Sequence, residues 1–275
     1  MDLTDKVVVI TGASSGIGRR VAVDFAAKGA CVCAAARRAD RLRALVTELG
    51  GPDGGHSFFV TDVSDRDQVR ALARHVEETY GRCDVLINNA GFSQAVDFEG
   101  PEAADVTEAV MRTNFLGAVW CTTELIDLLY RSVPSHVVNV ASVAGRLAAG
   151  SPAYTASKFA LVGWSEALHP VLAARGVYMS SVEPGVIPTE GFPATAIESN
   201  RLLMMTTGTT EQVSKAILDA IEGRKMQRVV PRWYYLLQIP RLLTPGLYRF
   251  ARRKLVDPIY KRDQTNDRSS GEPRP

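Results

Sequence analysis

Cysteine and histidine are scarce in this 275-residue chain, which has four of each and no C-x-x-C pair. Cys31 and Cys33 would project from the same face of a strand, which is poor geometry for a disulfide. The histidines, at positions 56, 75, 136 and 169, lack the spacing typical of metal ligands. We therefore expect reduced thiols, a cytoplasmic location and no bound metal.

Long apolar runs and a strong net charge are also absent. No segment reaches the roughly 18 uninterrupted apolar residues of a membrane-spanning helix, and the N-terminus lacks the basic region and cleavage site of a signal peptide. A composition of 46% hydrophobic and 23% charged residues excludes general disorder, collagen and polytopic membrane proteins. The net charge of +2 conceals an asymmetry, because residues 224–275 hold 13 Lys/Arg and four Asp/Glu, which leaves −7 for the rest.

Short β-branched runs alternate with amphipathic helical patterns, which is typical of β-α-β units. Right-handed crossovers would place helices on both faces of one parallel sheet. We therefore predict a single doubly wound Rossmann-type α/β domain over residues 1–231, followed by an amphipathic basic extension at 232–262 and a disordered tail at 263–275. Seven strands are predicted, at residues 6–11, 30–36, 57–61, 85–88, 136–140, 177–182 and 228–230.

A glycine-rich turn, Thr11-Gly12-Ala13-Ser14-Ser15-Gly16-Ile17-Gly18, separates the first strand from an apolar helix. Glycines let a backbone approach a pyrophosphate closely, and a helix N-terminus offers it free N–H groups. The spacing is G-x-x-x-G-x-G rather than G-x-G-x-x-G, and an ordinary tight turn is the alternative. At the end of the second strand, Arg37 and Arg38 stand where an NAD site commonly has an acid. They favour NADP(H) over NAD(H), with a solvated basic helix start as the alternative.

Tyr154 and Lys158 are four residues apart on a predicted helix and share one of its faces. A cation about 4 Å from a phenol is worth roughly 4 kcal/mol at an effective dielectric of 20, or about three pKa units before desolvation is subtracted. Lys158 could thus bring Tyr154 into the working range of a general acid and base. Ser142, at the end of the fifth strand, would be a second hydrogen-bond donor to a carbonyl oxygen.

Taken in order, these motifs resemble those of the short-chain dehydrogenase/reductase family over Asp5 to about Pro231. The other motifs of the resemblance are Asp62-Val63, Asn88-Asn89-Ala90-Gly91, and Pro184-Gly185 followed by Thr189. The resemblance implies a catalytic tetrad of Asn114, Ser142, Tyr154 and Lys158, with a water anchored by Asn114. It also implies that the cofactor contacts Gly12, Ser14, Ser15, Gly16, Ile17, Gly18, Arg37, Arg38, Asp62, Val63, Asn89, Ala90, Gly91, Tyr154, Lys158, Pro184, Gly185, Ile187 and Thr189.

Two departures from the family pattern are visible. The turn carries Ser15 where many NADP-preferring members have a base, so the NADP(H) prediction rests on Arg37 and Arg38. The interval from Ser142 to Tyr154 is one residue shorter than in many relatives, which affects loop shape. An apolar segment from Val186 to Thr209 resembles the family's substrate lid and suggests a lipophilic ketone or secondary alcohol of steroid, acyl or aryl type. A helix packed on its own core is the alternative for this segment.

The basic extension interleaves arginines with aromatic residues and leucines, and Pro240 and Pro245 break it into short pieces. A cap over the substrate entrance or a subunit interface is the favoured interpretation, and peripheral contact with anionic membrane is the alternative. No nucleic-acid-binding motif accompanies the bases. The sequence thus predicts an NADP(H)-dependent oxidoreductase that forms a dimer or tetramer. A non-catalytic dinucleotide sensor or membrane-associated scaffold is the alternative, which the complete tetrad disfavours.

Overall fold

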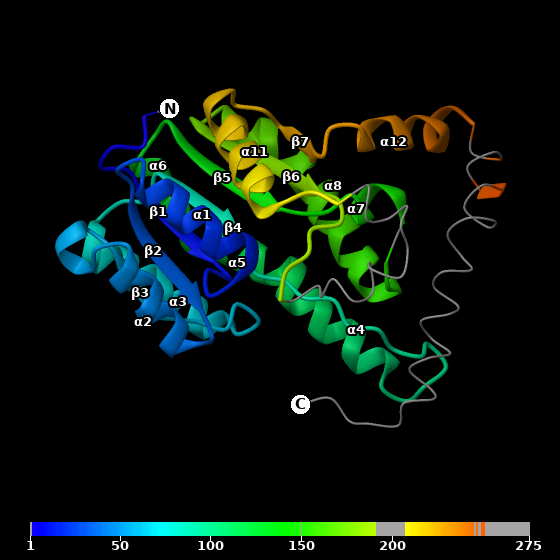
Figure 1. The fold of residues 1–275 in the computed structure, drawn as a ribbon, viewed down its shortest axis with the longest axis horizontal. Coiled ribbons are helices and arrows are strands. Elements are labelled where there is room, and N and C mark those ends of the chain that lie inside the picture. Colours follow the sequence, from blue (N-terminus) through cyan, green and yellow to red (C-terminus); the bar gives the residue numbers. More distant parts are fainter. Residues whose placement is uncertain (1, 149, 191–206, 245, 247–248, 251–275) are drawn as a thin grey trace.

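A seven-stranded, all-parallel sheet with the order β3-β2-β1-β4-β5-β6-β7 forms the centre of the molecule (Figure 1). The computed structural model describes residues 2–148, 150–190, 207–244, 246 and 249–250. All seven predicted strands are present, and the prediction of a doubly wound Rossmann-type sheet is confirmed. The strands are β1 (Val7–Thr11), β2 (Cys31–Ala36), β3 (Ser57–Val60), β4 (Val85–Asn88), β5 (Ser135–Val140), β6 (Val177–Pro184) and β7 (Gln227–Val230).

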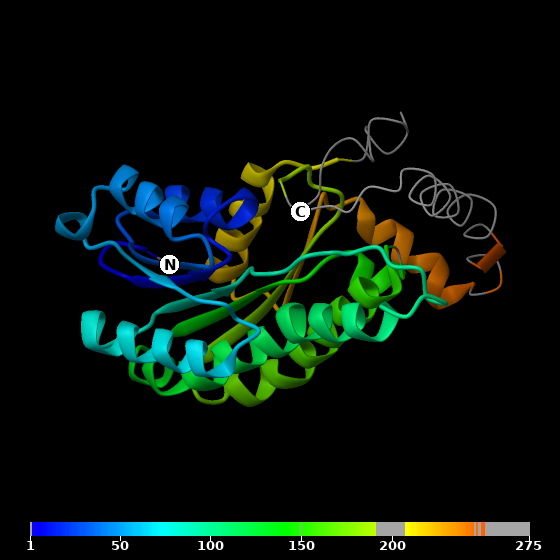
Figure 2. The same cartoon turned by 90° about the horizontal axis from the view of Figure 1, so that it is seen from below.

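Helices cover both faces of the sheet (Figure 2). One face carries α1 (Gly16–Ala26), α2 (Ala39–Glu48) and α11 (Thr210–Glu222). The other carries α3 (Arg66–Tyr80), α5 (Gly117–Glu124), α6 (Ile126–Arg131) and α8 (Pro152–Ala173). The remaining elements are η1 (Pro52–Gly54), α4 (Ala103–Met111), the π-helical turn η2 (Arg112–Leu116), α7 (Ala144–Leu147) and α12 (Tyr234–Leu243).

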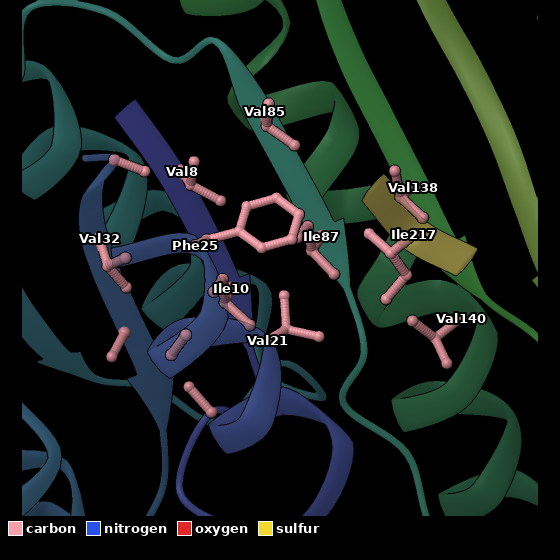
Figure 3. Close-up of a cluster of buried hydrophobic side chains, with 14 of the residues drawn as sticks. Val8, Ile10, Val21, Phe25, Val32, Val85, Ile87, Val138, Val140 and Ile217 are labelled. Atoms are coloured by element: carbon pink, nitrogen blue, oxygen red, sulfur yellow. The ribbon is translucent and has the colours of Figure 1, made fainter. Parts of the chain in front are cut away.

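The strands are buried on both faces, which explains why they appear in the sequence as nearly continuous apolar runs. All five residues of β1 are buried, and successive side chains serve opposite layers. Val8 and Ile10 pack with Phe25 of α1 (Figure 3), whereas Val9 belongs to the cluster under α3 and α8. Burial of each such side chain is worth about 1.5–3 kcal/mol, so this alternation fixes the sheet between its two helical layers.

Two helix starts follow directly from capping residues. Ser151 accepts a hydrogen bond from the Tyr154 backbone N–H, and Pro152 occupies the first helical position of α8. Thr209 and Gln212 form a reciprocal capping box at the start of α11. The cap at Ser151 sets the phase of α8, and with it the face on which Tyr154 and Lys158 lie.

The C-terminal extension begins as a helix against the domain, and the predicted break at Pro240 is wrong, because α12 continues through Pro240 to Leu243. Tyr234 of α12 is buried with Val143, Leu147 and Val229, so this end of α12 packs on α7 and β7. Residues 251–262 of the predicted extension, the predicted tail at 263–275 and residues 191–206 of the predicted lid lie outside the described residues. Among those described, no helix is both long and apolar enough to cross a membrane.

Candidate active site

The glycine turn after β1 lies under the loop that follows β4, and the two are joined by side-chain bonds. Asn89 donates from Nδ2 to the carbonyl of Thr11 at 3.0 Å, and the Thr11 hydroxyl accepts from the backbone N–H groups of Asn89 and Ala90 at 3.0 and 3.1 Å. Gly12 has φ of +66°, and a Cβ there would lie 2.8 Å from Asn89 Nδ2. A Cβ on Gly18 would collide with the Gly12 carbonyl. Both positions therefore require glycine.

This turn forms a cradle that fits a dinucleotide pyrophosphate. It opens directly into α1, whose N-cap is Ser15 and whose first N–H groups point out of the helix end. Ser14 is largely buried within the turn, and Ile17 packs on the core. Small residues in such a turn let a ligand approach the backbone at the helix N-terminus, and the nucleotide-binding role of this turn stays a prediction.

Arg38 and Arg37 occupy different environments. Arg38 donates to Ser14 Oγ at 3.0 Å and to Ser15 Oγ at 2.7 Å, which fixes its guanidinium beside the turn. Arg37 is exposed to solvent. The predicted basic pair is therefore brought to the site through Arg38. A second guanidinium is supplied by Arg41, one helical turn further along α2, which pairs with Glu190.

Asp62 and Val63, which the family resemblance places beside the cofactor, follow β3. Asp62 accepts hydrogen bonds from the backbone N–H and hydroxyl of Ser64, at 2.9 and 2.7 Å. Val63 is buried, and a Cβ on Gly117 would lie 2.9 Å from its Cγ2, so Val63 packs directly on the start of α5. The Asp62 side chain therefore organises its own loop, while Val63 anchors that loop to the helix below.

Asn114 lies in the π-helical turn η2 and is 1% exposed. Its amide brackets the backbone of Phe92, accepting from the N–H and donating to the carbonyl, both at 2.9 Å. Nδ2 also donates to Ser157 Oγ at 3.1 Å, and Ser157 donates to the Tyr154 carbonyl at 2.7 Å. Asn114 thereby connects the loop after β4 to the helix that carries Tyr154. Such π turns are frequent at functional sites.

Ser142 lies just beyond the end of β5, at the start of the loop leading to α7. Its hydroxyl donates to the Pro184 carbonyl at 3.3 Å and accepts from the Ala144 N–H at 3.1 Å. The Pro184 carbonyl also accepts from the Val143 N–H at 2.9 Å, so the ends of β5 and β6 are joined at this point. These contacts hold the Ser142 side chain at the carboxyl edge of the sheet.

Tyr154 and Lys158 share one face of α8, as the four-residue spacing predicts, with the ammonium 5.6 Å from the ring centroid. Burial raises the pKa of Tyr154 to about 12, and a side-chain hydrogen bond with Ser142 opposes this rise. Lys158 is 4% exposed and donates to the Val140 carbonyl at 2.9 Å. Burial lowers the pKa of its ammonium to about 8. The sequence predicts that the positive charge of Lys158 lowers the pKa of Tyr154. In the structure, desolvation of the phenol outweighs this attraction and raises the pKa instead.

Asn114 and Lys158 both approach the backbone of Gly91, and Tyr154 lies between Lys158 and Ser142 in the chain of contacts. A Cβ on Gly91 would lie 3.1 Å from Asn114 Oδ1 and 3.6 Å from Lys158 Nζ. The segment after β6 closes the other side, where Ile187 is buried and Thr189 packs on Gly16. Gly185 donates to the Val230 carbonyl at 2.7 Å and lies directly under the Tyr234 ring. Within the described ranges, no group of three His, Cys, Asp or Glu side chains is placed to hold a metal ion.

A family model described as short chain dehydrogenase matches residues 6–198, which contain the glycine turn, the four tetrad candidates and Glu190. The chain belongs to the short-chain dehydrogenase family. Farnesol dehydrogenase of Aedes aegypti is 34% identical over 220 residues, which cover 78% of this chain and 88% of that protein. The 3-oxoacyl-[acyl-carrier-protein] reductase FabG of Thermotoga maritima is 34% identical over 224 residues, covering 79% and 91%.

A solved structure has the same architecture as this short-chain dehydrogenase. It is the Pseudomonas aeruginosa RhlG/NADP active-site complex, and it matches with a TM-score of 0.75 at 27% identity over 83% of this chain and 96% of that one. The family relationship confirms the predicted enzyme class, an NAD(P)-dependent oxidoreductase that acts on CH–OH groups.

Sequence reasoning missed three residues that the structure places at the candidate site. Ser157 bonds both Asn114 and the Tyr154 backbone, and only its place beside Lys158 could have drawn notice. Arg41 was detectable, because it lies three residues after Arg38 at a predicted helix start and so shares its face. Glu190 had no signal in the sequence, since its partners are about 150 residues away in the chain.

Proposed function

We propose that this chain is an NADP(H)-dependent oxidoreductase that interconverts a lipophilic ketone and its secondary alcohol. The observation that carries the proposal is the Tyr154 side chain, which bonds Ser142 and whose ring centroid lies 5.6 Å from the buried Lys158 ammonium. All three lie at the carboxyl edge of the sheet, where ligands bind in open α/β folds. The glycine turn lies at the same edge and fits a pyrophosphate.

The preference for NADP(H) is supported by Arg38. Its guanidinium lies beside the glycine turn, and a planar fork of N–H donors is suited to a phosphate. The similar RhlG structure is likewise a complex with NADP. When bound, the nicotinamide supplies the hydride that adds to the carbonyl carbon, and it accepts a hydride in the reverse reaction.

In this proposal Tyr154 and Ser142 both bind the carbonyl oxygen of the substrate, and each has a different role. Tyr154 donates its phenolic proton to that oxygen during reduction and accepts the proton back during oxidation. Ser142 donates a second hydrogen bond to the same oxygen, where negative charge develops. Lys158 stabilises the phenolate, and Asn114 holds the π turn and anchors the water through which Tyr154 is reprotonated.

The lipophilic substrate is the finer part of the proposal. Farnesol and a 3-oxoacyl group, the substrates named for two relatives, both contain a hydrocarbon chain. In this chain, the residues that follow Ser142 contribute Val143 and Leu147 to an apolar cluster with Tyr234 of α12. That cluster is buried, so the lipophilic substrate is proposed from the two relatives and from the apolar composition of residues 186–209.

Replacement of Tyr154 by Phe tests the catalytic assignment. We expect Tyr154→Phe to reduce NADPH-dependent turnover of lipophilic ketones at least a hundredfold, because proton transfer by a positioned side chain typically contributes 10²–10⁴-fold. NADPH binding, followed by fluorescence titration, should change little. Tyr178→Phe is the matched control, since its hydroxyl accepts a bond from Arg224 at the opposite edge of the sheet. Undiminished turnover in Tyr154→Phe would contradict the assignment.

We also propose that the two faces of α12 have different roles, one packing on the domain and the other contacting a membrane. Its inner face caps the domain through Tyr234, and Arg241 donates to the Arg146 carbonyl and lies 4.8 Å from the Phe159 ring centroid. Its outer face exposes Leu236, Ile239 and Leu243, which repeat at helical spacing. We assign this stripe to peripheral contact with an anionic membrane, because basic residues surround it in the sequence. The assembly into a dimer or tetramer stays a prediction, which sedimentation velocity can test. The cytoplasmic location also stays a prediction.

A further inference from the structure

Glu190 joins the segment after β6 to the basic residues at the end of β2. One carboxylate oxygen accepts from Arg38 at 2.8 Å, and the other pairs with Arg41. Arg38 donates at the same time to the hydroxyls of Ser14 and Ser15. Two guanidinium groups are thus ordered around a single carboxylate, with two hydroxyl groups at the rim.

These donors have the chemistry of a phosphate site. Guanidinium forks bind carboxylate and phosphate with the same planar geometry. Ser15 is also the N-cap of the 11-residue helix α1, so the partial positive charge of that helix end lies beside the same group of donors. A hollow of about 370 Å³ extends from Ser14 and Ser15 past Arg41 to Glu190, which leaves space for a ligand.

The backbone before Glu190 crosses the nucleotide turn. A Cβ built on Gly16 would lie 3.2 Å from Thr189 Cβ, so Thr189 rests on the turn itself. Glu190 then continues toward the rim at Arg38 and Arg41. The segment therefore runs over the glycine turn. The Glu190 carboxylate lies against Arg38 and Arg41, the groups that would donate hydrogen bonds to a 2′-phosphate.

We propose that Glu190 is a specificity-determining residue, an internal carboxylate that competes with the nucleotide 2′-phosphate for Arg38 and Arg41. This inference rests on the proposed preference for NADP(H). A ligand with the phosphate displaces the carboxylate and takes over both guanidinium groups. A ligand without it lacks the group that would replace Glu190, so the carboxylate keeps its partners. Removing the carboxylate therefore favours phosphorylated nucleotides selectively.

Isothermal titration with 2′,5′-ADP and with 5′-ADP, which lacks the 2′-phosphate, tests the competition without any catalytic step. Exposed ion pairs are weak, so we expect Glu190→Gln to tighten 2′,5′-ADP binding by about two- to tenfold at low salt, while 5′-ADP binding changes less than about twofold. Arg41→Gln should weaken 2′,5′-ADP binding. Glu190 is exposed, so these substitutions should leave the fold intact, and circular dichroism verifies this.

Glu48→Gln is the matched control, because it removes the same charge from the same rim but pairs with Arg19 instead. Equal effects of Glu190→Gln and Glu48→Gln would show a long-range charge effect and overturn the competition. A wild-type chain that selects 2′,5′-ADP, with selectivity unchanged in Glu190→Gln, would overturn this inference alone. Indifference to the 2′-phosphate in both proteins would overturn the proposed NADP(H) preference and the inference with it.

Discussion

Burial shifts the pKa values of Tyr154 and Lys158 on α8 in opposite directions. It favours the neutral phenol of Tyr154, and it favours the neutral amine of Lys158. A protonated phenol is the form needed to donate a proton to a ketone. The site is therefore better prepared for reduction than for oxidation, before any contribution from a bound nucleotide.

This asymmetry predicts different pH profiles for the two directions. With the pKa of Tyr154 at about 12, the phenol stays protonated through pH 6–10. Titration of Tyr154 should therefore cause little change in kcat for reduction over this range. Oxidation needs the phenolate, whose fraction rises about tenfold per pH unit below the pKa. We expect kcat for oxidation to rise from pH 7 to 8, where Lys158, with a pKa of about 8, still carries the charge that stabilises the phenolate. Steady-state rates in both directions measure this, and an oxidation rate that falls over this range would contradict it.

The buried ammonium of Lys158 should lower stability at neutral pH. Its pKa falls from 10.5 to about 8, which at 1.36 kcal/mol per unit corresponds to about 3 kcal/mol at pH 7. Lys158→Met removes this cost but leaves the Val140 carbonyl without its donor. We expect the variant to be inactive yet more stable than wild type by about 1–3 kcal/mol at pH 7.

The pH dependence of the free energy of unfolding provides a second test of Lys158→Met. Between pH 8 and 10.5 the unfolded chain still binds the proton that folded Lys158 has lost, so wild-type stability rises with pH in this window. The advantage of the variant should therefore shrink from pH 7 to 9.5. Urea unfolding of both proteins at the two pH values gives the comparison, and an advantage that grew with pH would contradict the argument.

At the scale of elements, the strands were predictable because each is a short apolar run buried on both faces, as in β1 and β5. The phase of α8 followed from the spacing of Tyr154 and Lys158. The position of Asn114 came from the family resemblance, since no periodicity reveals one extra residue in a helical turn. The Glu190 contacts depend on a crossing of distant segments, which a local pattern cannot encode.

The packing of α12 predicts that its two faces respond differently to truncation. Tyr234 is 6% exposed and fills the space above Gly185, so Tyr234→Ala should lower the free energy of unfolding by about 3 kcal/mol. Leu236, on the other face, is 64% exposed, and Leu236→Ala should change it by less than about 0.5 kcal/mol. Urea unfolding measures both, and similar values for the two variants would contradict this placement of α12.

At the scale of the whole molecule, charge and chemistry are separated along the chain. The excess of +9 belongs to residues 224–275, whereas Arg38 and Arg41 lie in the part whose balance is −7. A net charge therefore says nothing about the nucleotide site of this molecule. It bears instead on the end of the chain that carries the exposed stripe of α12.

The charge distribution predicts salt-sensitive membrane binding. We expect the protein to co-sediment with vesicles containing about 30% phosphatidylserine and to stay in solution with pure phosphatidylcholine, because each base near an anionic surface adds about 1 kcal/mol. Binding should weaken at about 0.5 M salt. A double Leu236→Ser, Leu243→Ser variant, altered only at exposed positions, should bind less. Equal binding to both vesicle types would contradict the membrane assignment of the stripe.

The π turn η2 has a consequence for how the chain can tolerate insertions and deletions. A π turn closes with one residue more than an α turn, and each residue advances a helix by about 100°. Loss of one residue from Arg112–Leu116 would rotate all of α5, taking Gly117 away from Val63 and turning the buried Cys121 out of the core. Two requirements therefore constrain the length of this turn. It must place the Asn114 amide beside Phe92, and it must set the rotation of α5 so that the buried face of this helix meets the core.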